Sequence, residues 1–212
     1  MIAIDLHTHS QASPDGSLTI EDYRRMLANG PLDVIAVTDH NRIDFARELH
    51  DELGEQIIVG EEITTTSGEV IGLYLQTAVP AGLPLAQAVS IIHQQGGLVY
   101  IPHPFETVRQ GISPQALAEI ANQVDIIEIY NGRSLQQKAP QAQVWQRDHT
   151  VVGAASSDAH GRRGWGKTYS ILDDKPTKAT LMGLLETAQH SQQSSGVIGR
   201  LYPKLNRLRK HF

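Results

Sequence analysis

Short apolar runs rich in valine and isoleucine alternate along the chain with longer stretches in which apolar residues recur every three or four positions. Short runs bounded by turn residues are typical of buried strands, and the longer periodicity is typical of helices. The pattern predicts strands at residues 2–6, 33–38, 57–60, 69–75, 98–101, 125–129, 151–155 and 168–172. It predicts helices at residues 19–28, 44–53, 85–95, 114–122, 135–148 and 178–190.

Alternating strands and helices predict an α/β fold with a parallel sheet covered by helices. Six or more such repeats in about 190 residues fit either an open doubly wound sheet or a small β/α barrel. At about 150 residues per domain, the length of 212 residues predicts a single domain. The clear break in composition is Gln192-Gln193-Ser194-Ser195-Gly196, so we expect a domain at residues 1–191 and a linker with a tail at residues 192–212.

Several helix ends also carry local signals. Thr19 is followed three positions later by Asp22, and Ser113 is followed by Pro114, so both residues resemble N-caps. We expect left-handed C-terminal caps at the three glycines that follow predicted helices, which are Gly30, Gly54 and Gly96.

Charge and cysteine content restrict the classes of function. The formal net charge of −5 argues against a general nucleic-acid coat. The absence of cysteine excludes disulfides, thiolate ligands and a cysteine nucleophile, so any metal site must use His, Asp and Glu. Neither a leader segment nor an apolar run long enough to span a bilayer is present in the sequence. We therefore expect a soluble, cytoplasmic protein without a membrane partner.

The tail differs from the rest of the chain. Five of the 18 basic residues and none of the 23 acidic residues follow Gly199. Leu201, Leu205 and Leu208 fall on one face of a helix whose other face carries the cations. Two interpretations are open: a terminal helix docked on the domain, or a basic helix that binds an anionic partner such as RNA, lipid or a nucleotide.

Polar residues follow directly after five of the predicted strands. The carboxyl ends of parallel strands are where functional sites assemble, because the loops converge there. Two His residues that are two positions apart on an extended chain can reach the same ion. The strand ends read His7-Thr8-His9, Thr38-Asp39-His40, Gly60-Glu61-Glu62, Pro102-His103-Pro104 and Asp158-Ala159-His160.

Imidazoles and carboxylates that cluster in a partly buried place require a cation. The candidate ligands are His7, His9, Asp15, His40, Glu62, His103, Asp158 and His160. They suffice for two or three divalent ions if one carboxylate bridges. A single His at a strand end is more often a hydrogen-bonding residue, and the Pro-Asp-Gly sequence around Asp15 is equally a turn signal. We expect the other histidines to be surface or packing residues: His50, His93, His149, His190 and His211.

These residues resemble the PHP family, named for polymerase and histidinol phosphatase. The similarity spans residues 5–160 and is carried by Asp5-Leu6-His7-Thr8-His9-Ser10, Pro14-Asp15-Gly16, Thr38-Asp39-His40-Asn41, Gly60-Glu61-Glu62-Ile63, Pro102-His103-Pro104 and Ser157-Asp158-Ala159-His160. The resemblance implies a distorted seven-stranded, TIM-like β/α barrel with a centre of two or three divalent ions (Mn, Zn or Fe).

Carried over by position, the resemblance assigns His7, His9, Glu62 and Asp158 to one ion and Asp15, His40 and His160 to another. A third, middle ion would use Glu62 as a bridge together with His103 and a further imidazole. This chain has Glu69 in place of that imidazole, and a carboxylate can also bind a hard or borderline ion.

The segment Ile126-Ile127-Glu128-Ile129-Tyr130-Asn131-Gly132-Arg133 is similar to the corresponding part of small stand-alone family members. Arg133 follows a strand end, where its planar guanidinium is suited to clamping a phosphate. Arg162, Arg163 and Lys167 are further candidate clamps, although a solvated loop cation is the simpler interpretation for each. Trp165 either lines the pocket mouth or packs within its loop, and packing is the simpler interpretation.

The resemblance implies hydrolysis of a phosphoester in a small phosphorylated substrate. We expect ion-activated water to attack phosphorus and His160 or His9 to protonate the leaving oxygen. Two alternatives stay open: a nuclease that acts on short RNA or DNA ends and recruits the oligonucleotide through the basic tail, and a non-catalytic protein that binds metal or a phosphorylated ligand. The sequence has neither a phosphate-binding P-loop nor a serine-hydrolase elbow, and it carries no signal for oligomeric state.

Overall fold

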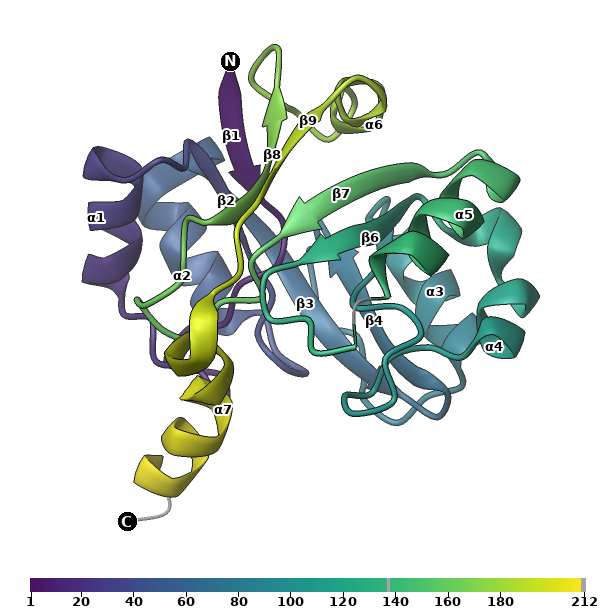
Figure 1. Cartoon of the computed structure of the whole chain (residues 1–212), viewed down its shortest axis with the longest axis horizontal. Helices are drawn as coiled ribbons and strands as arrows, with labels where there is room; N and C mark the ends of the chain where they lie inside the picture. Colours follow the sequence, from purple (N-terminus) through teal and green to yellow (C-terminus); the bar gives the residue numbers. More distant parts are fainter. Residues whose placement is uncertain (137, 211–212) are drawn as a thin grey trace.

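The computed structural model describes residues 1–136 and 138–210. Within this part of the chain, nine strands form one sheet in the order β7-β6-β5-β4-β3-β2-β1-β8-β9 (Figure 1). Their bounds are β1 Ile2–Asp5, β2 Val34–Val37, β3 Ile57–Thr65, β4 Gly68–Leu73, β5 Leu98–Ile101, β6 Ile126–Asn131, β7 Val152–Ser156, β8 Thr168–Leu172 and β9 Gln189–Gln192.

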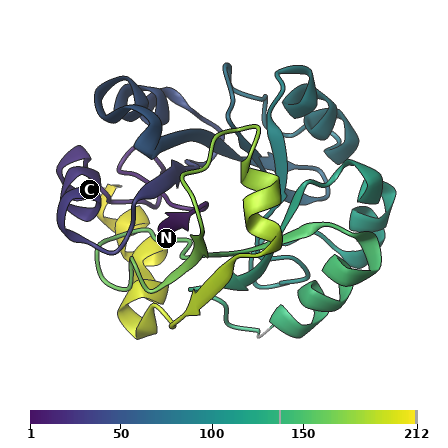
Figure 2. The same ribbon diagram turned by 90° about the horizontal axis from the view of Figure 1, so that it is seen from above.

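The sheet curls until its two edges almost meet, and it forms a ring with helices on the outside (Figure 2). The segment after β1 pairs with the segment after β7, since the Asp158 amide donates to the His7 carbonyl at 2.9 Å and the His9 amide donates to the Ala159 carbonyl at 2.8 Å. These bonds close the ring at the carboxyl ends of both strands. The TIM-like barrel class is therefore confirmed.

The structure corrects the predicted strand count and strand directions. In the part of the chain that the structure describes, the sheet has nine strands rather than seven, and it is mixed rather than parallel. Strand β4 pairs antiparallel with β3 and β5, and β8 pairs antiparallel with β1 and β9. The sequence pattern identifies a strand but carries no signal for its direction. Gln189–Gln192, the end of a predicted helix and the start of the predicted linker, is strand β9, which lacks the apolar run that marks the predicted strands.

Seven α-helices accompany the described strands: α1 Ile20–Asn29, α2 Asp44–Leu53, α3 Leu85–Gln94, α4 Pro114–Glu119, α5 Ala139–His149, α6 Leu181–Glu186 and α7 Gly196–Lys210. Thr19 caps α1 and Ser113 caps α4 through side-chain oxygens, as predicted. Gly54 and Gly96 have φ of 64° and 69°. Gly30 has φ of −92°, so the prediction of a left-handed cap is wrong there.

Apolar residues fill both sides of the sheet. One cluster lies between the strands and the outer helices, and it includes Tyr23, Phe45 and Leu49. A second cluster contains Leu181 and Leu185 of α6 with residues from the strands. Figure 1 shows α6 at one end of the barrel and α7 at the opposite end. The carboxyl ends of the parallel strands therefore open toward α7. Among the described residues, no helix is both long and apolar enough to cross a membrane.

Trp165 is a packing residue, as the simpler interpretation of the sequence expected. Its side chain is buried, and its ring meets the ring of Tyr23 edge-on at 5.1 Å between centroids. It contributes to the outer apolar cluster.

We expect Trp165→Ala to lower the free energy of unfolding by about 3–5 kcal/mol, because it removes a buried indole and leaves a cavity. Urea denaturation would measure the loss. Arg162→Ala, which changes an exposed residue of the same loop, should alter stability by no more than about 0.5 kcal/mol. Equal stability of the Trp165→Ala variant and the wild type would contradict the packing role.

Candidate metal centre

Strand alternation brings polar residues to the mouth of the barrel. Side chains an even number of positions apart share one face of a strand. Five members of the inner apolar cluster are Ala36, Ile58, Ile71, Ile126 and Ala154. Two or four positions nearer the mouth, the same strands or their extensions carry His40, Glu62, Glu69, Glu128 and Asp158. One face of the sheet thus changes from apolar at its base to charged at its open end.

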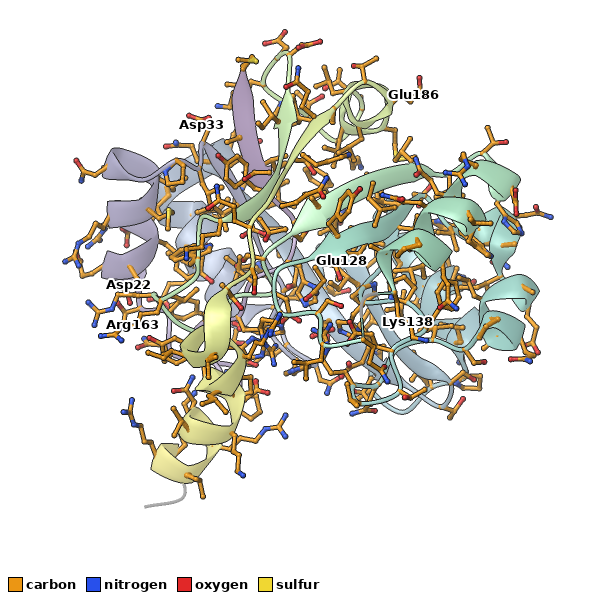
Figure 3. All side chains as sticks on the ribbon, viewed as in Figure 1. Asp22, Asp33, Glu128, Lys138, Arg163 and Glu186 are labelled. Atoms are coloured by element: carbon orange, nitrogen blue, oxygen red, sulfur yellow. The ribbon has the colours of Figure 1, made fainter. Side chains whose placement is uncertain are left out.

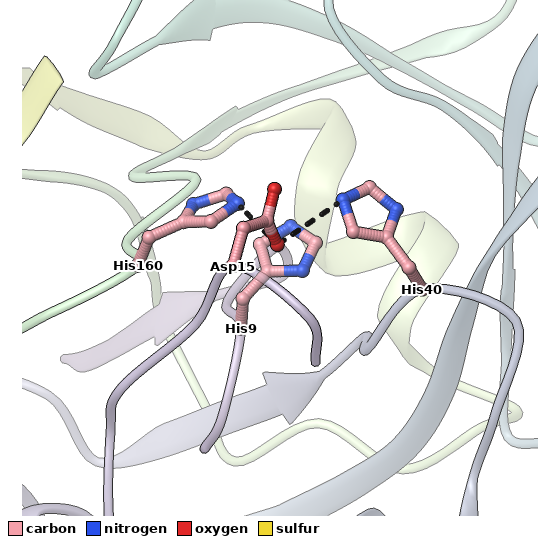
Figure 4. Close-up of side chains that lie close together, drawn as sticks. All are labelled: His9, Asp15, His40 and His160. Atoms are coloured by element: carbon pink, nitrogen blue, oxygen red, sulfur yellow. Dashed lines mark ion pairs between the residues drawn. The ribbon is translucent and has the colours of Figure 1, made fainter. Parts of the chain in front are cut away.

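The first group of candidate ligands is His9, Asp15, His40 and His160 (Figure 4). Asp15 lies in the loop between β1 and α1. Its Oδ1 is 3.6 Å from Nε2 of His40 and 3.5 Å from Nε2 of His160. The rings of His9 and His160 lie 4.0 Å apart between centroids. The Pro-Asp-Gly loop therefore carries Asp15 into the cluster rather than only forming a turn.

Glu62 connects the remaining groups. Its Oε2 lies 3.2 Å from Nε2 of His9 and 3.3 Å from Nδ1 of His40, and its Oε1 lies 2.9 Å from Nε2 of His103. Glu62 is buried within β3, which continues past the predicted strand end at residue 60. The two oxygens of one carboxylate therefore face different imidazoles, which is the arrangement that a carboxylate shared by two ions would require.

Asp158 and His7 form the opposite side of the cluster. Oδ1 of Asp158 lies 3.7 Å from Nε2 of His7 and 3.5 Å from Nε2 of His9. The backbone φ angles of Asp158 and His103 are 53° and 29°, which are uncommon for residues other than glycine. Such strained residues concentrate at functional sites, where the surrounding structure holds them.

Glu69 stands at the sequence position where the family resemblance expects an imidazole ligand. The structure places its carboxylate beside His40 and His103. Its carboxylate is 3.6 Å from Nδ1 of His40 and 3.8 Å from Nε2 of His103. Burial, together with the charge of the neighbouring Glu62 carboxylate, raises the pKa of Glu69 to about 8. A cation bound at this position would favour the ionised form of Glu69.

The spacing of the donor atoms fits divalent ions. Two atoms that are each about 2.1 Å from one tetrahedral ion lie about 3.4 Å apart. The Nε2 atoms of His7 and His9 are 3.1 Å apart, and each is 3.5 or 3.7 Å from Oδ1 of Asp158. Nδ1 of His9 and Nδ1 of His103 are buried without a hydrogen-bond partner among the described residues. The donor set of imidazoles and carboxylates suits Mn, Zn or Fe.

Burial and neighbouring charges shift the protonation of the cluster in opposite directions. Burial, together with His160 and His40, lowers the pKa of His9 to about 3. Burial also disfavours protonation of His7, but the carboxylates of Asp158, Glu62 and Glu128 outweigh it and hold the pKa of His7 well above its usual value. The cluster therefore contains at least one neutral imidazole, which is the form that binds a metal ion.

A cavity of about 490 Å³ opens above this cluster. Its wall includes five cationic residues from three parts of the chain: Arg109, Arg133, Arg200, Lys204 and Arg207. Nη1 of Arg133 lies 2.8 Å from Oδ1 of Asp158, and Arg109 pairs with the other carboxylate oxygen, Oδ2. The cavity thus combines a floor of candidate metal ligands with a positively charged wall.

The sequence of residues 5–147, more than half of the chain, matches the PHP domain. This chain belongs to the PHP family. The match agrees with the resemblance carried by the strand-end motifs. As in the sequence-based assignment, Asp15, His40 and His160 form one group, and His9 joins them. The structure brings all nine predicted ligands together, and the division of these ligands among individual ions stays a prediction.

Two relatives come from Methanocaldococcus jannaschii. The chain is 31% identical over 140 residues to the uncharacterized protein MJ1587, a match that covers 60% of this chain and 82% of that protein. It is 33% identical over 175 residues to the uncharacterized protein MJ0417, a match that covers 74% of this chain and 65% of that protein. The chain therefore spans slightly less than two thirds of the second relative.

Solved structures share the PHP fold at low sequence identity. A two-domain protein from Bacteroides vulgatus, described as containing a predicted PHP-like metal-dependent phosphoesterase, superimposes with a TM-score of 0.71 at 20% identity, covering 91% of this chain and 65% of that chain. PsfC from Pseudomonas syringae gives a TM-score of 0.68 at 16% identity, covering 99% and 98%. An amidohydrolase from Chromobacterium violaceum, solved with bound sulfate and no metal, gives 0.65 at 15% identity, covering 89% and 98%.

Glu128 is a site residue that the ligand prediction did not include. Its Oε1 lies 3.2 Å from Nδ1 of His7 and accepts from the Tyr100 hydroxyl at 2.9 Å, and its Oε2 accepts from the His103 amide at 2.6 Å. A carboxylate that holds the far nitrogen of a ligating His fixes its tautomer and orientation. The signal was present in the sequence, because Glu128 interrupts the otherwise apolar run 126–129.

The candidate phosphate clamps divide into two sets. Arg133 lines the cavity, and its role as a phosphate clamp stays a prediction. Arg162, Arg163 and Lys167 are exposed and are absent from the described cavity wall, so the simpler interpretation as solvated cations holds for them. Figure 3 shows Arg163 at the periphery, whereas Glu128 lies in the interior. Arg109 belongs to a loop without a recognisable motif, and sequence analysis missed it.

The remaining described histidines lie elsewhere, as expected. Nδ1 of His50 lies 2.7 Å from the Ile57 carbonyl, and Nε2 of His93 lies 3.2 Å from Asp125. Nδ1 of His149 lies 2.9 Å from the Trp145 carbonyl. His190 is half-buried in β9, and His211 is outside the described residues.

Two adjacent carboxylates of β3 provide a matched test of the centre. Glu62 faces the cluster, whereas Glu61 lies on the other face of the strand and accepts from the Val79 amide at 2.7 Å. We expect Glu62→Gln to reduce bound metal by at least one ion per chain, because it removes the bridging charge. Glu61→Gln should bind as many ions as the wild type. Elemental analysis after equilibration with Mn²⁺, Zn²⁺ or Fe²⁺ measures both, and equal loss in the two variants would contradict the assignment.

Proposed function

We propose that this PHP protein hydrolyses phosphoester bonds with the help of two or three divalent ions. One observation carries the proposal: nine buried or half-buried imidazoles and carboxylates lie in overlapping groups beneath a cavity with a cationic wall. The first feature is suited to holding ions, and the second is suited to an anionic substrate.

The proposed ligands are His7, His9, Asp15, His40, Glu62, Glu69, His103, Asp158 and His160. Divalent ions held there would lower the pKa of a water molecule and withdraw negative charge from phosphate oxygens. The side chains of this chain then set where such chemistry takes place. Glu62 would contribute one oxygen to each of two neighbouring ion positions, because its two oxygens face different imidazoles. Glu128 orients His7 from behind.

Arg133 is proposed to stabilise the charge that builds up on the phosphate during the reaction. Its guanidinium projects from the loop after β6, and its Nη1 already bonds to Asp158. This position keeps a fixed positive charge beside the proposed ion sites, so little reorganisation is needed when substrate binds. Arg109 pairs with the other carboxylate oxygen of Asp158 and so helps to hold Asp158 in place.

We propose that His160 rather than His9 gives a proton to the leaving oxygen when its ring is not occupied as an ion ligand. His160 lines the cavity, whereas the His9 side chain is fully buried. A proton donor must come within hydrogen-bond reach of the substrate. Nδ1 of His160 lies 3.0 Å from Nη1 of Arg133, which places the imidazole next to the proposed phosphate clamp.

We propose that the organic part of the substrate binds in a second cavity. This cavity of about 360 Å³ shares His103 and Arg200 with the first. Its wall mixes apolar groups such as Ile129 and Pro140 with polar groups such as Asn131 and Gln193. This mixture suits a small, partly polar alcohol, so the proposed substrate is a small phosphorylated molecule.

A nuclease acting on RNA or DNA ends is a second candidate, favoured by the basic helix at the cavity. Lys204 and Arg209 of α7 are exposed, and a polyanion that leaves the cavity would pass along this helix. Deletion of the tail does not separate the two candidates, since α7 also contributes Arg207 to the cavity wall. Substitution of an exposed cation of α7 that lies outside the described cavity wall separates the two candidates.

The proposed role of Arg133 predicts a specific pattern of loss. We expect Arg133→Ala to lower kcat on phosphomonoesters by about 100-fold while the ion content is retained, because removal of one electrostatic stabiliser typically has this effect. Asp158→Ala should lose both bound metal and hydrolysis. The assay is a broad phosphoester panel with added Mn²⁺, Zn²⁺ or Fe²⁺. Wild-type turnover by Asp158→Ala would refute the hydrolytic site, and metal binding without any turnover by the wild type would favour a binding protein.

Comparison of two substrates distinguishes the small-ester and nuclease candidates. We expect Arg209→Ala, which changes an exposed cation outside the described cavity wall, to hydrolyse a small phosphomonoester with kcat/KM within twofold of the wild type. If the chain is instead a nuclease, the same variant will lose turnover of short oligonucleotides, and the loss will shrink as salt concentration rises. Efficient oligonucleotide cleavage with no activity on small esters would overturn the first proposal.

A further inference from the structure

Helix α7 contacts the barrel through its polar side and leaves its apolar side in solvent. Val197, Ile198, Leu201, Leu205 and Leu208 fall within roughly one 100° arc of the helix, and between 40% and 72% of each residue is exposed. The buried residues of this helix are Gly199 and Asn206. The contact therefore rests on hydrogen bonds, ion pairs and close backbone approach rather than on the leucine face.

Asn206 joins two loops that carry candidate metal ligands. It is 2% exposed, and its Nδ2 donates to the Asp15 carbonyl at 2.8 Å and to the His160 carbonyl at 2.9 Å. The His160 carbonyl also accepts from the Ser17 hydroxyl at 2.9 Å. Both protons of one buried amide thus hold the backbone at two ligands that are far apart in the sequence. No other side chain type of this size offers two such donors without a charge.

Arg207 acts on the Asp15 side chain itself. Its Nη2 lies 2.7 Å from Oδ2 of Asp15, whereas Oδ1 of the same carboxylate faces His40 and His160. The arginine therefore holds the oxygen that points away from these imidazoles. A carboxylate that is bonded on its outer oxygen has fewer orientations available to its inner oxygen.

Neighbouring contacts keep α7 in register with both loops. Nζ of Lys210 donates to the Gln11 carbonyl at 2.7 Å and to the Ser13 carbonyl at 2.5 Å. On the other loop, a Cβ at Gly161 would lie 2.5 Å from the Tyr202 ring. The ring can occupy this place only because the residue after His160 has no side chain.

We infer that Asn206 and Arg207 are positioning residues that preorganise the ion site formed by His9, Asp15, His40 and His160. On this inference, residues 196–210 complete the metal centre although they lie outside the matched PHP segment at residues 5–147. The inference rests on the proposed metal centre and does not depend on the bond that is hydrolysed. It also explains why a helix with an exposed leucine face is held at the cavity.

Metal affinity is the direct readout. Asn206→Asp preserves the shape of the side chain but presents an acceptor to two carbonyl oxygens, and Arg207→Ala removes the ion pair with Asp15. We expect both variants to bind one ion of the cluster about 10–100-fold more weakly, the effect typical of losing an outer partner of a metal ligand. The other ions should bind within twofold of their wild-type affinity. Arg207→Lys, which keeps a positive charge, should recover part of the loss.

The experiment is competition of full-length protein against a chelator of known affinity, with Mn²⁺ or Zn²⁺, followed by elemental analysis. Arg209→Ala is the matched control because Arg209 is an exposed cation on the same helix. Wild-type affinity for every ion in both Asn206→Asp and Arg207→Ala would overturn the inference. If Asn206→Asp fails to fold, Arg207→Ala decides alone, since 60% of the Arg207 side chain is exposed and its loss leaves no buried cavity.

The outcome separates this inference from the proposed function. A wild type that binds ions but hydrolyses none of the tested phosphoesters contradicts the function and leaves the affinity test valid. A wild type that binds no ion contradicts the metal centre itself and the inference with it. Equal weakening of all ions in Asn206→Asp and Arg207→Ala would also overturn the inference, because it would indicate general loosening of the barrel.

Discussion

The charge balance at the mouth of the barrel is the constraint on which the rest of this structure depends. Four carboxylates and five imidazoles share a small volume there: Asp15, Glu62, Glu69, Asp158, His7, His9, His40, His103 and His160. Carboxylates this close cannot all remain ionised in a buried place unless positive charge compensates them. Arg109, Arg133 and Arg207 supply part of it. Divalent ions would supply the rest, and their binding would account for the arrangement in which each imidazole faces a carboxylate.

The barrel satisfies this constraint by simple geometry. Alternation along each strand keeps apolar groups at the base and sends polar groups from the same face to the open end. Closure between the segments after β1 and β7 then places His7 and His9 beside Asp158. Glu128 and helix α7 hold the ligands from outside the cluster, one through the ring of His7 and the other through the Asp15 loop. The cluster itself unites ligands from His7 to His160, which are about three quarters of the chain apart.

Much of the fold and site could be predicted because strand ends carry local signals. The eight apolar runs marked eight strands, and the His-x-His and Asp-x-His pairs marked ligands directly after them. Features that depend on distant partners could not be predicted in this way. Glu128 acquires its role from His7, which is 121 residues away. Strand β9 forms because β8 offers an edge, not because Gln189–Gln192 alternates in polarity.

The C-terminal helix illustrates the same limit. Leu201, Leu205 and Leu208 indicated a helix correctly, but they suggested a buried face that the structure leaves exposed. The docked face is defined by Asn206 and Arg207. Their partners are two backbone carbonyls, one in a loop at the start of the barrel and one near its end, and a carboxylate in the first of these loops. The sequence pattern registers the spacing of apolar residues, whereas the contact of α7 with the barrel depends on specific hydrogen bonds.

Anomalous diffraction from crystals of the full-length protein soaked in Mn²⁺ or Zn²⁺ tests the central claim most directly. The account predicts two or three peaks at the barrel mouth, each about 2.0–2.3 Å from imidazole nitrogens or carboxylate oxygens of the nine predicted ligands. Glu62 should contact at least two of them. Absence of ions from this cluster in a protein saturated with metal, or ions bound only at other surfaces, would contradict the account.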